Sequence, residues 1–104
     1  MTAKRRVRVA EVKEVPAGAG RVVDAAGVSL ALFNVGGAFY AIDNRCAHRG
    51  GPLGEGELEG TVVTCPWHAW HWDVTTGANT NNPAARVLCF PVTVEDGAVF
   101  VEVG

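Results

Sequence analysis

The chain has 104 residues, of which 48% are apolar, and its formal net charge is −2. This length fits a single domain, residues 1–104, and this apolar content argues against intrinsic disorder. A charge so close to neutral argues against a nucleic-acid-binding surface, which would need a basic stripe.

The cysteine content and the N-terminal pattern both favour a cytoplasmic protein. The chain has three cysteines, whereas extracellular disulfide frameworks usually contain an even number. Glu11, Lys13 and Glu14 interrupt any apolar run that could follow the basic N-terminal residues, so no signal-peptide core is expected. No stretch approaches the ~20 apolar residues of a membrane-spanning helix, so we expect no membrane partner.

In chain order, the pattern predicts short β-strands and no helix with clear periodicity. Two glycine-containing turns, Gly36–Gly37 and Asp96–Gly97, predict tight hairpins. The fold class expected from such closely spaced strands is an antiparallel sandwich or small barrel. The predicted strand segments are Val7–Val9, Val12–Val15, Arg21–Asp24, Val28–Val35, Phe39–Ile42, Thr61–Thr64, Trp70–Val74, Arg86–Val94 and Ala98–Val103.

Two segments are predicted to be loops, Asn44–Gly60 and Ala78–Ala85. Both lie beside cysteine and histidine motifs, and long loops on a rigid β scaffold often carry function.

Four residues form two ligand pairs, Cys46 with His48 and Cys65 with His68. Each pair offers one thiolate and one imidazole, which suits a [2Fe–2S] cluster with both cysteines on one iron and both histidines on the other. The alternative is a structural zinc site, although zinc ligand pairs usually have two to four intervening residues, and Cys46 and His48 have one.

The motifs at residues 46–53, at residues 65–68 and at residues 72–77 resemble the two ligand boxes of the Rieske family, and the similarity continues through residues 90–103. This resemblance implies an all-β, Rieske-like fold: an antiparallel β-sandwich of three small sheets, with the cluster between two loops at one tip. It also implies that Cys46 and Cys65 bind the buried iron. His48 and His68 would then bind the outer iron, with their ring edges exposed to a partner.

The chain differs from the respiratory Rieske branch at four positions. That branch has a disulfide beside the cluster, and the matching residues here are Gly51 and Trp67. It also has Ser and Tyr hydroxyls near cluster sulfurs, where this chain has Trp70 and Trp72. Hydrogen bonds to sulfur tune these potentials, so we expect a reduction potential near the low end, roughly −150 mV. The pattern resembles the ferredoxins of aromatic-ring dioxygenases.

Several further residues have competing interpretations. Cys89 is expected to be a small core residue, and His71 an exposed strand histidine that is not a ligand. We expect Trp67 to shield the cluster, while Trp70 is either a second shield or ordinary core packing. Arg49 is the preferred docking residue because it follows His48.

The loops beside the boxes offer further candidates. Leu53 and Pro83 are either caps of the cluster or ordinary turn residues, and in relatives a proline-containing loop such as Asn81–Pro83 has the capping role. Glu55, Glu57 and Glu59 are interpreted as a solvated turn, with electrostatic steering of a basic partner as the alternative.

The expected function is that of an electron carrier, not of a stand-alone enzyme. The resemblance implies a soluble ferredoxin that takes one electron from a flavin reductase and passes it to a terminal oxygenase, with no small-molecule substrate of its own. The alternatives are the small subunit of an assimilatory nitrite reductase, a zinc-containing interaction domain without redox function, and a regulatory iron–sulfur sensor.

Overall fold

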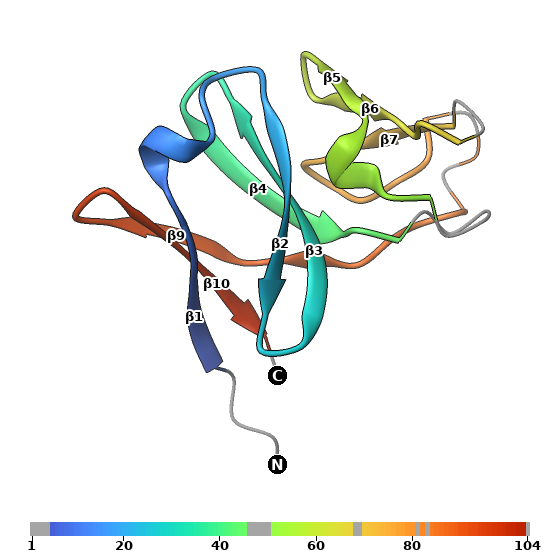
Figure 1. Ribbon diagram of the computed structural model, residues 1–104. Coiled ribbons are helices and arrows are strands. Elements are labelled where there is room, and N and C mark those ends of the chain that lie inside the picture. Colours follow the sequence, from blue (N-terminus) through green and yellow to red (C-terminus); the bar gives the residue numbers. More distant parts are fainter. Residues whose placement is uncertain (1–4, 46–50, 68–69, 81, 83, 104) are drawn as a thin grey trace.

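The computed structural model describes residues 5–45, 51–67, 70–80, 82 and 84–103. These residues form three antiparallel sheets and two short 3₁₀ helices, η1 (Val12–Glu14) and η2 (Leu53–Glu55), as Figure 1 shows. The all-β, three-sheet prediction is therefore confirmed. The strands are β1 (Arg5–Glu11), β2 (Gly20–Ala25), β3 (Val28–Val35), β4 (Ala38–Asp43), β5 (Glu57–Glu59), β6 (Val62–Thr64), β7 (His71–Asp73), β8 (Cys89–Phe90), β9 (Val92–Glu95) and β10 (Ala98–Val103).

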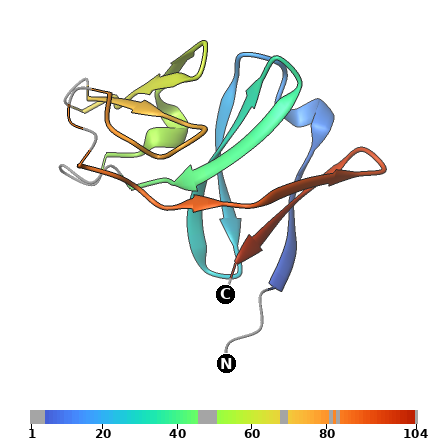
Figure 2. The same ribbon diagram turned by 180° about the vertical axis from the view of Figure 1, so that it is seen from behind.

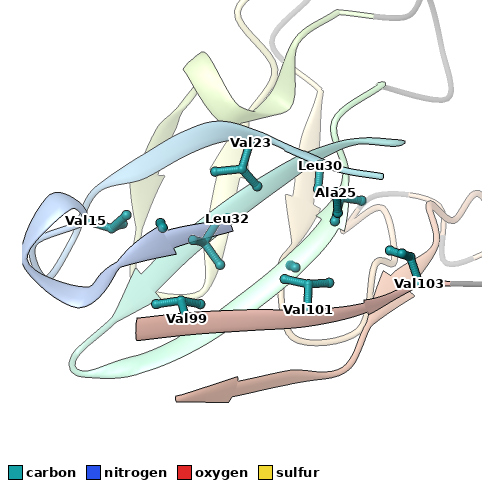
Figure 3. Close-up of a cluster of buried hydrophobic side chains, with 10 residues drawn as sticks. Val15, Val23, Ala25, Leu30, Leu32, Val99, Val101 and Val103 are labelled. Atoms are coloured by element: carbon teal, nitrogen blue, oxygen red, sulfur yellow. The ribbon is translucent and has the colours of Figure 1, made fainter. Parts of the chain in front are cut away.

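The middle sheet has the strand order β2-β3-β4-β8, and β3 is buried on both of its faces. Leu30 and Leu32 pack into a first core shared with the β1-β10-β9 sheet, which Figure 3 shows. Ala31 and Phe33 point to the opposite face, into a second core. Burial on both faces explains why the sequence of β3 is a nearly continuous apolar run instead of an alternating one.

The third sheet has the order β5-β6-β7 and lies on the opposite side of the middle sheet from the β9–β10 hairpin (Figures 1 and 2). Trp72 of β7, Val63 of β6 and Leu53 of η2 are fully buried in the second core together with Phe33 of β3. This packing fixes the β6–β7 hairpin, whose connecting loop contains the second ligand motif.

Both predicted tight turns are present. Gly36 and Gly37 connect β3 to β4 with φ angles of 58° and 101°. Asp96 and Gly97 connect β9 to β10 with φ angles of 50° and 76°, the left-handed values that Asp-Gly hairpins favour.

The prediction of a strand at Val12–Val15 is wrong. Pairing of β1 with β10 ends at Glu11 opposite Ala98, directly beside the Asp96–Gly97 turn, so the next residues have no strand to pair with. The chain instead forms η1, where Val15 donates a backbone hydrogen bond to Val12. The side chain of Val15 is buried in the first core, which explains the apolar residue there.

Two other boundaries differ from the sequence prediction. Within the predicted loop Asn44–Gly60, the structure has both η2 and strand β5, in which half-buried Leu58 faces Val63. The predicted strand Arg86–Val94 begins only at Cys89 and is divided at Pro91, because β8 pairs with β4 and β9 pairs with β10. Pro91 lacks a backbone N–H and suits the point at which the chain changes sheets.

Candidate metal centre

The second ligand motif lies in a closed loop between β6 and β7. Thr64 and His71 are the last paired residues of the hairpin, and the Cys65 amide donates to the Trp70 carbonyl at 2.7 Å. Cys65 is 2% exposed and belongs to the second core. Its thiol is therefore positioned by a buried hairpin, whereas His68 lies outside the described residues.

The first motif follows β4, and its loop is closed by Asn44. The Asn44 carbonyl accepts a hydrogen bond from the Leu53 amide at 2.7 Å, and its side-chain Oδ1 accepts one from the Gly54 amide at 2.8 Å. Its own amide donates to the Ser29 carbonyl at 3.2 Å. Asn44 thus joins the two ends of this loop to β3, a role that the sequence pattern did not predict. Cys46, His48 and Arg49 lie outside the described residues.

Gly51 brings the two loops together. It is buried, and a Cβ atom at this position would lie only 2.7 Å from Cys65 Sγ. The same atom would lie 3.3 Å from the Trp67 Cβ, slightly less than the ~3.8 Å mean separation of Cβ atoms in a disulfide. Residues 51 and 67 are therefore spatial neighbours, as the Rieske resemblance implies for the disulfide positions, and neither is a cysteine.

The three tryptophans have different surroundings. Trp67 is 58% exposed, so it presents a large apolar ring to solvent, and ordinary core packing is excluded for it. Trp70 is half-buried and stacks on Trp72, with a distance of 6.1 Å between ring centroids. Trp72 is fully buried, and its indole Nε1–H has no hydrogen-bond acceptor among the described residues. Burying a donor in this state costs about 1–3 kcal/mol.

Other candidate residues are placed as follows. His71 is exposed, as predicted. Leu53 is fully buried in the second core, so it is a packing residue on the first loop, while Pro83 lies outside the described residues. The three glutamates Glu55, Glu57 and Glu59 are exposed, but Glu57 and Glu59 belong to β5 and not to a turn.

The prediction that Cys89 is a small core residue is wrong, because Cys89 is exposed. It lies on β8, opposite Ile42 at the edge of the middle sheet. Partial burial of the sulfur raises the pKa of the Cys89 thiol above its usual value. Arg86 opposes this shift of the pKa, and the negative charge of Asp73 adds to it.

The arrangement fits an iron–sulfur cluster. Cys65 is buried without a disulfide partner, and Gly51 leaves room beside its sulfur. The unpartnered indole donor of Trp72 lies in the same core as Cys65. Within the described ranges, no three His, Cys, Asp or Glu side chains form a metal-binding group, since three of the four predicted ligands lie outside these ranges.

Residues 5–91 match the family described as the Rieske [2Fe–2S] domain. The chain belongs to this family. Membership implies one Rieske-type [2Fe–2S] cluster, with a potential governed by its ligands and by hydrogen bonds to its sulfurs.

Similar proteins include ferredoxins that match this chain over nearly their whole length. The 3-phenylpropionate/cinnamic acid dioxygenase ferredoxin subunit of Escherichia coli K12 is 41% identical over 99 residues, covering 93% of this chain and 92% of the relative. The ferredoxin of Sphingomonas yanoikuyae B1 is 32% identical with a TM-score of 0.87, covering 96% of this chain and 100% of that one. The Rieske protein described here is thus an electron carrier of the ferredoxin type.

Two further solved structures have a similar fold. One, the complex of reduced oxygenase and oxidised ferredoxin in carbazole 1,9a-dioxygenase, contains a chain 34% identical to this one, with a TM-score of 0.84 and coverage of 92% and 91%. A putative NADPH nitrite reductase small subunit has a TM-score of 0.81 at 20% identity, which shows a shared fold alone. Among the described residues of the present chain, no helix is long and apolar enough to cross a membrane.

Proposed function

We propose that this Rieske ferredoxin carries single electrons from a flavin-dependent reductase to the terminal oxygenase of a ring-hydroxylating dioxygenase system. The observation that carries the proposal is the similarity, over 93% of the chain, to a dioxygenase ferredoxin subunit. The carbazole dioxygenase complex supports an oxygenase as the acceptor, because its ferredoxin has the same fold. The odd number of cysteines supports a cytoplasmic location.

The proposed ligands are Cys46 and Cys65 for the buried iron, and His48 and His68 for the outer iron. Two observations support this set. Cys65 is buried beside Gly51, and the Asn44 hydrogen bonds close the loop that contains Cys46 and His48. Two thiolates balance the +2 charge of an oxidised two-iron, two-sulfide core, so the oxidised site is neutral. When bound, this group takes up and releases one electron at a higher potential than a four-cysteine cluster.

The potential is proposed to lie near the low end of the Rieske range, roughly −150 mV. Gly51 and Trp67 replace the disulfide, and no Ser or Tyr hydroxyl stands at residues 70 and 72. A lower potential suits a carrier that donates its electron to another redox protein.

The proposed exit route for the electron is the surface around Trp67, beside the second ligand motif. Trp67 is the largest exposed apolar side chain there, so it would contact the oxygenase and exclude water. Glu55 and Glu57 line a hollow together with Cys65 and Trp67, which adds negative charge beside this surface. Arg49 is proposed to contribute a positive charge next to His48.

A reconstituted electron-transfer chain tests this function. NADH, a flavin-dependent ferredoxin reductase and a ring-hydroxylating oxygenase are mixed with the purified protein, and hydroxylated product is measured. We expect product only when the protein is present, and a Cys65→Ser variant should not support it. If the protein exchanges no electrons with the oxygenase but binds a sirohaem protein stoichiometrically, the nitrite reductase alternative is correct. A colourless protein with one zinc would reject both.

A further inference from the structure

The indole of Trp72 combines complete burial with an unused hydrogen-bond donor. Trp72 is 0% exposed, and no acceptor for its Nε1–H exists among the residues that the structure describes. Buried donors in folded proteins almost always have a partner, and an indole N–H can only donate. The acceptor is therefore expected to be an atom of a bound group that lies beside the indole.

The ladder between β6 and β7 places Trp72 on the same face as Cys65. Trp72 is paired with Val63, and Cys65 follows two residues later, so strand alternation puts the side chains of Val63 and Cys65 on one face. All three residues belong to the second core, and Trp70 stacks on Trp72 from the end of the hairpin where Cys65 lies. The free indole donor and the Cys65 thiol thus share one buried space.

We infer that Trp72 Nε1–H donates a hydrogen bond to a sulfur of the bound cluster, either a cysteine thiolate or a bridging sulfide. This inference rests on the proposed ligand set. Sulfur gains negative charge when the cluster is reduced, so a donor aimed at it stabilises the reduced state more than the oxidised state. Trp72 would then raise the reduction potential and supply a donor at a position without a hydroxyl.

Two substitutions that differ by one hydroxyl test this role. Trp72→Phe removes the donor, and we expect the equilibrium constant for reduction to fall about tenfold, which is ~59 mV for a one-electron couple. Trp72→Tyr returns a donor, and the potential should recover at least in part. Phe33→Leu is the control for repacking, because Phe33 is fully buried in the same core and has no polar atom. Equal potentials in the Phe, Tyr and parent proteins would overturn the inference.

A measurement on the parent protein covers the case in which Trp72→Phe does not assemble. Tryptophan labelled with ¹⁵N at the indole nitrogen should give a hyperfine coupling in the electron spin echo spectrum of the reduced protein. The coupling should persist in the single variants Trp67→Phe and Trp70→Phe, which remove the other two tryptophans. Absence of any indole coupling in a protein that shows the Rieske signal would reject the hydrogen bond while leaving the proposed function intact.

Discussion

Gly51 lies directly against the sulfur of Cys65, so that a Cβ atom on residue 51 would be 2.7 Å from Sγ. This contact joins the loop of the first ligand motif to the loop of the second. It also explains why residue 51 is a glycine: a side chain would not fit beside the sulfur, whereas the backbone conformation does not require glycine.

Replacing Gly51 with alanine should reduce the amount of cluster bound. The added methyl group would displace the Cys65 sulfur or separate the loops, and overpacking of this kind costs typically 1–3 kcal/mol. Iron and sulfide analysis of the purified variant measures the effect. Gly97→Ala is the control, because Gly97 has a positive φ of 76° but open space around it in the distant hairpin. That variant should lose stability and keep full cluster content; the same iron loss in both would attribute the effect to general destabilisation.

Asn44→Ala should loosen the first ligand loop. The substitution removes the acceptor of the Gly54 amide, and we expect the free energy of unfolding to fall by about 1 kcal/mol, together with faster loss of the cluster. Denaturant titration and the rate of colour loss in a chelator check these two effects. Ser29→Ala is the matched control, since it removes only an exposed contact of 3.3 Å to the Asn44 side chain. Unchanged cluster loss in Asn44→Ala would contradict this role.

Cysteine alkylation distinguishes the ligand cysteines from Cys89. The protein with its cluster should take up one equivalent of iodoacetamide at Cys89, and the protein stripped of iron and unfolded should take up three. Mass spectrometry locates the modified residues. Modification of Cys46 or Cys65 in the intact, coloured protein would be inconsistent with both serving as ligands.

Alkylation of Cys89 should require a higher pH than alkylation of an unperturbed cysteine. Because burial raises the pKa of the Cys89 thiol, its thiolate fraction at a given pH is below that of an unperturbed cysteine, and the thiolate is the reactive form. Arg86 lowers this pKa, so Arg86→Gln should raise it and slow the reaction at pH 8. Asp73→Asn should have the opposite effect. If the alkylation rate of Cys89 had its pH midpoint at or below that of a free cysteine, a raised thiol pKa would be contradicted.

Trp67→Ala should leave the cluster intact and slow electron transfer to the oxygenase by about tenfold, which corresponds to ~1.4 kcal/mol of lost binding. Stopped-flow mixing of reduced ferredoxin with oxidised oxygenase measures this rate. Val94→Ala, an exposed apolar substitution on β9 at the opposite side of the molecule (Figure 1), should not change it. Equal rates in all three proteins would exclude Trp67 from the docking surface.

Much of the fold follows from local signals in the sequence. The turns at Gly36–Gly37 and Asp96–Gly97 have positive φ angles, and Gly-Gly and Asp-Gly are residue pairs that predict such turns. Strand β3 could be located because a strand buried on both faces has a continuous apolar sequence. The wrong predictions concern features that depend on contacts between elements distant in the sequence. The predicted strand Val12–Val15 lies beyond Glu11, the last residue of β1 that pairs with β10. The exposure of Cys89 likewise depends on how β8 packs in the folded protein.

The sequence indicates candidate ligands, which stay a prediction, but it does not indicate the residues that support their loops. Cys65 and His68 stand out by residue type and spacing, whereas Asn44 closes a loop through hydrogen bonds from Leu53 and Gly54, nine and ten positions away. The weak signal for Asn44 was its place directly after a strand and before a glycine-rich segment. The Trp72 donor could not be recognised from sequence, because its importance depends on the absence of an acceptor in the folded core.

Nitrogen hyperfine spectroscopy of the reduced protein, with ¹⁵N-labelled histidine, tests the ligand set most directly. The chain has three histidines, and we predict couplings from the two at residues 48 and 68, unchanged when the exposed His71 is replaced by glutamine. Replacing His48 with cysteine should remove one coupling and lower the potential, or prevent assembly. A reduced protein without histidine coupling, or an identical spectrum and potential in His48→Cys, would contradict a cluster bound by two cysteines and two histidines.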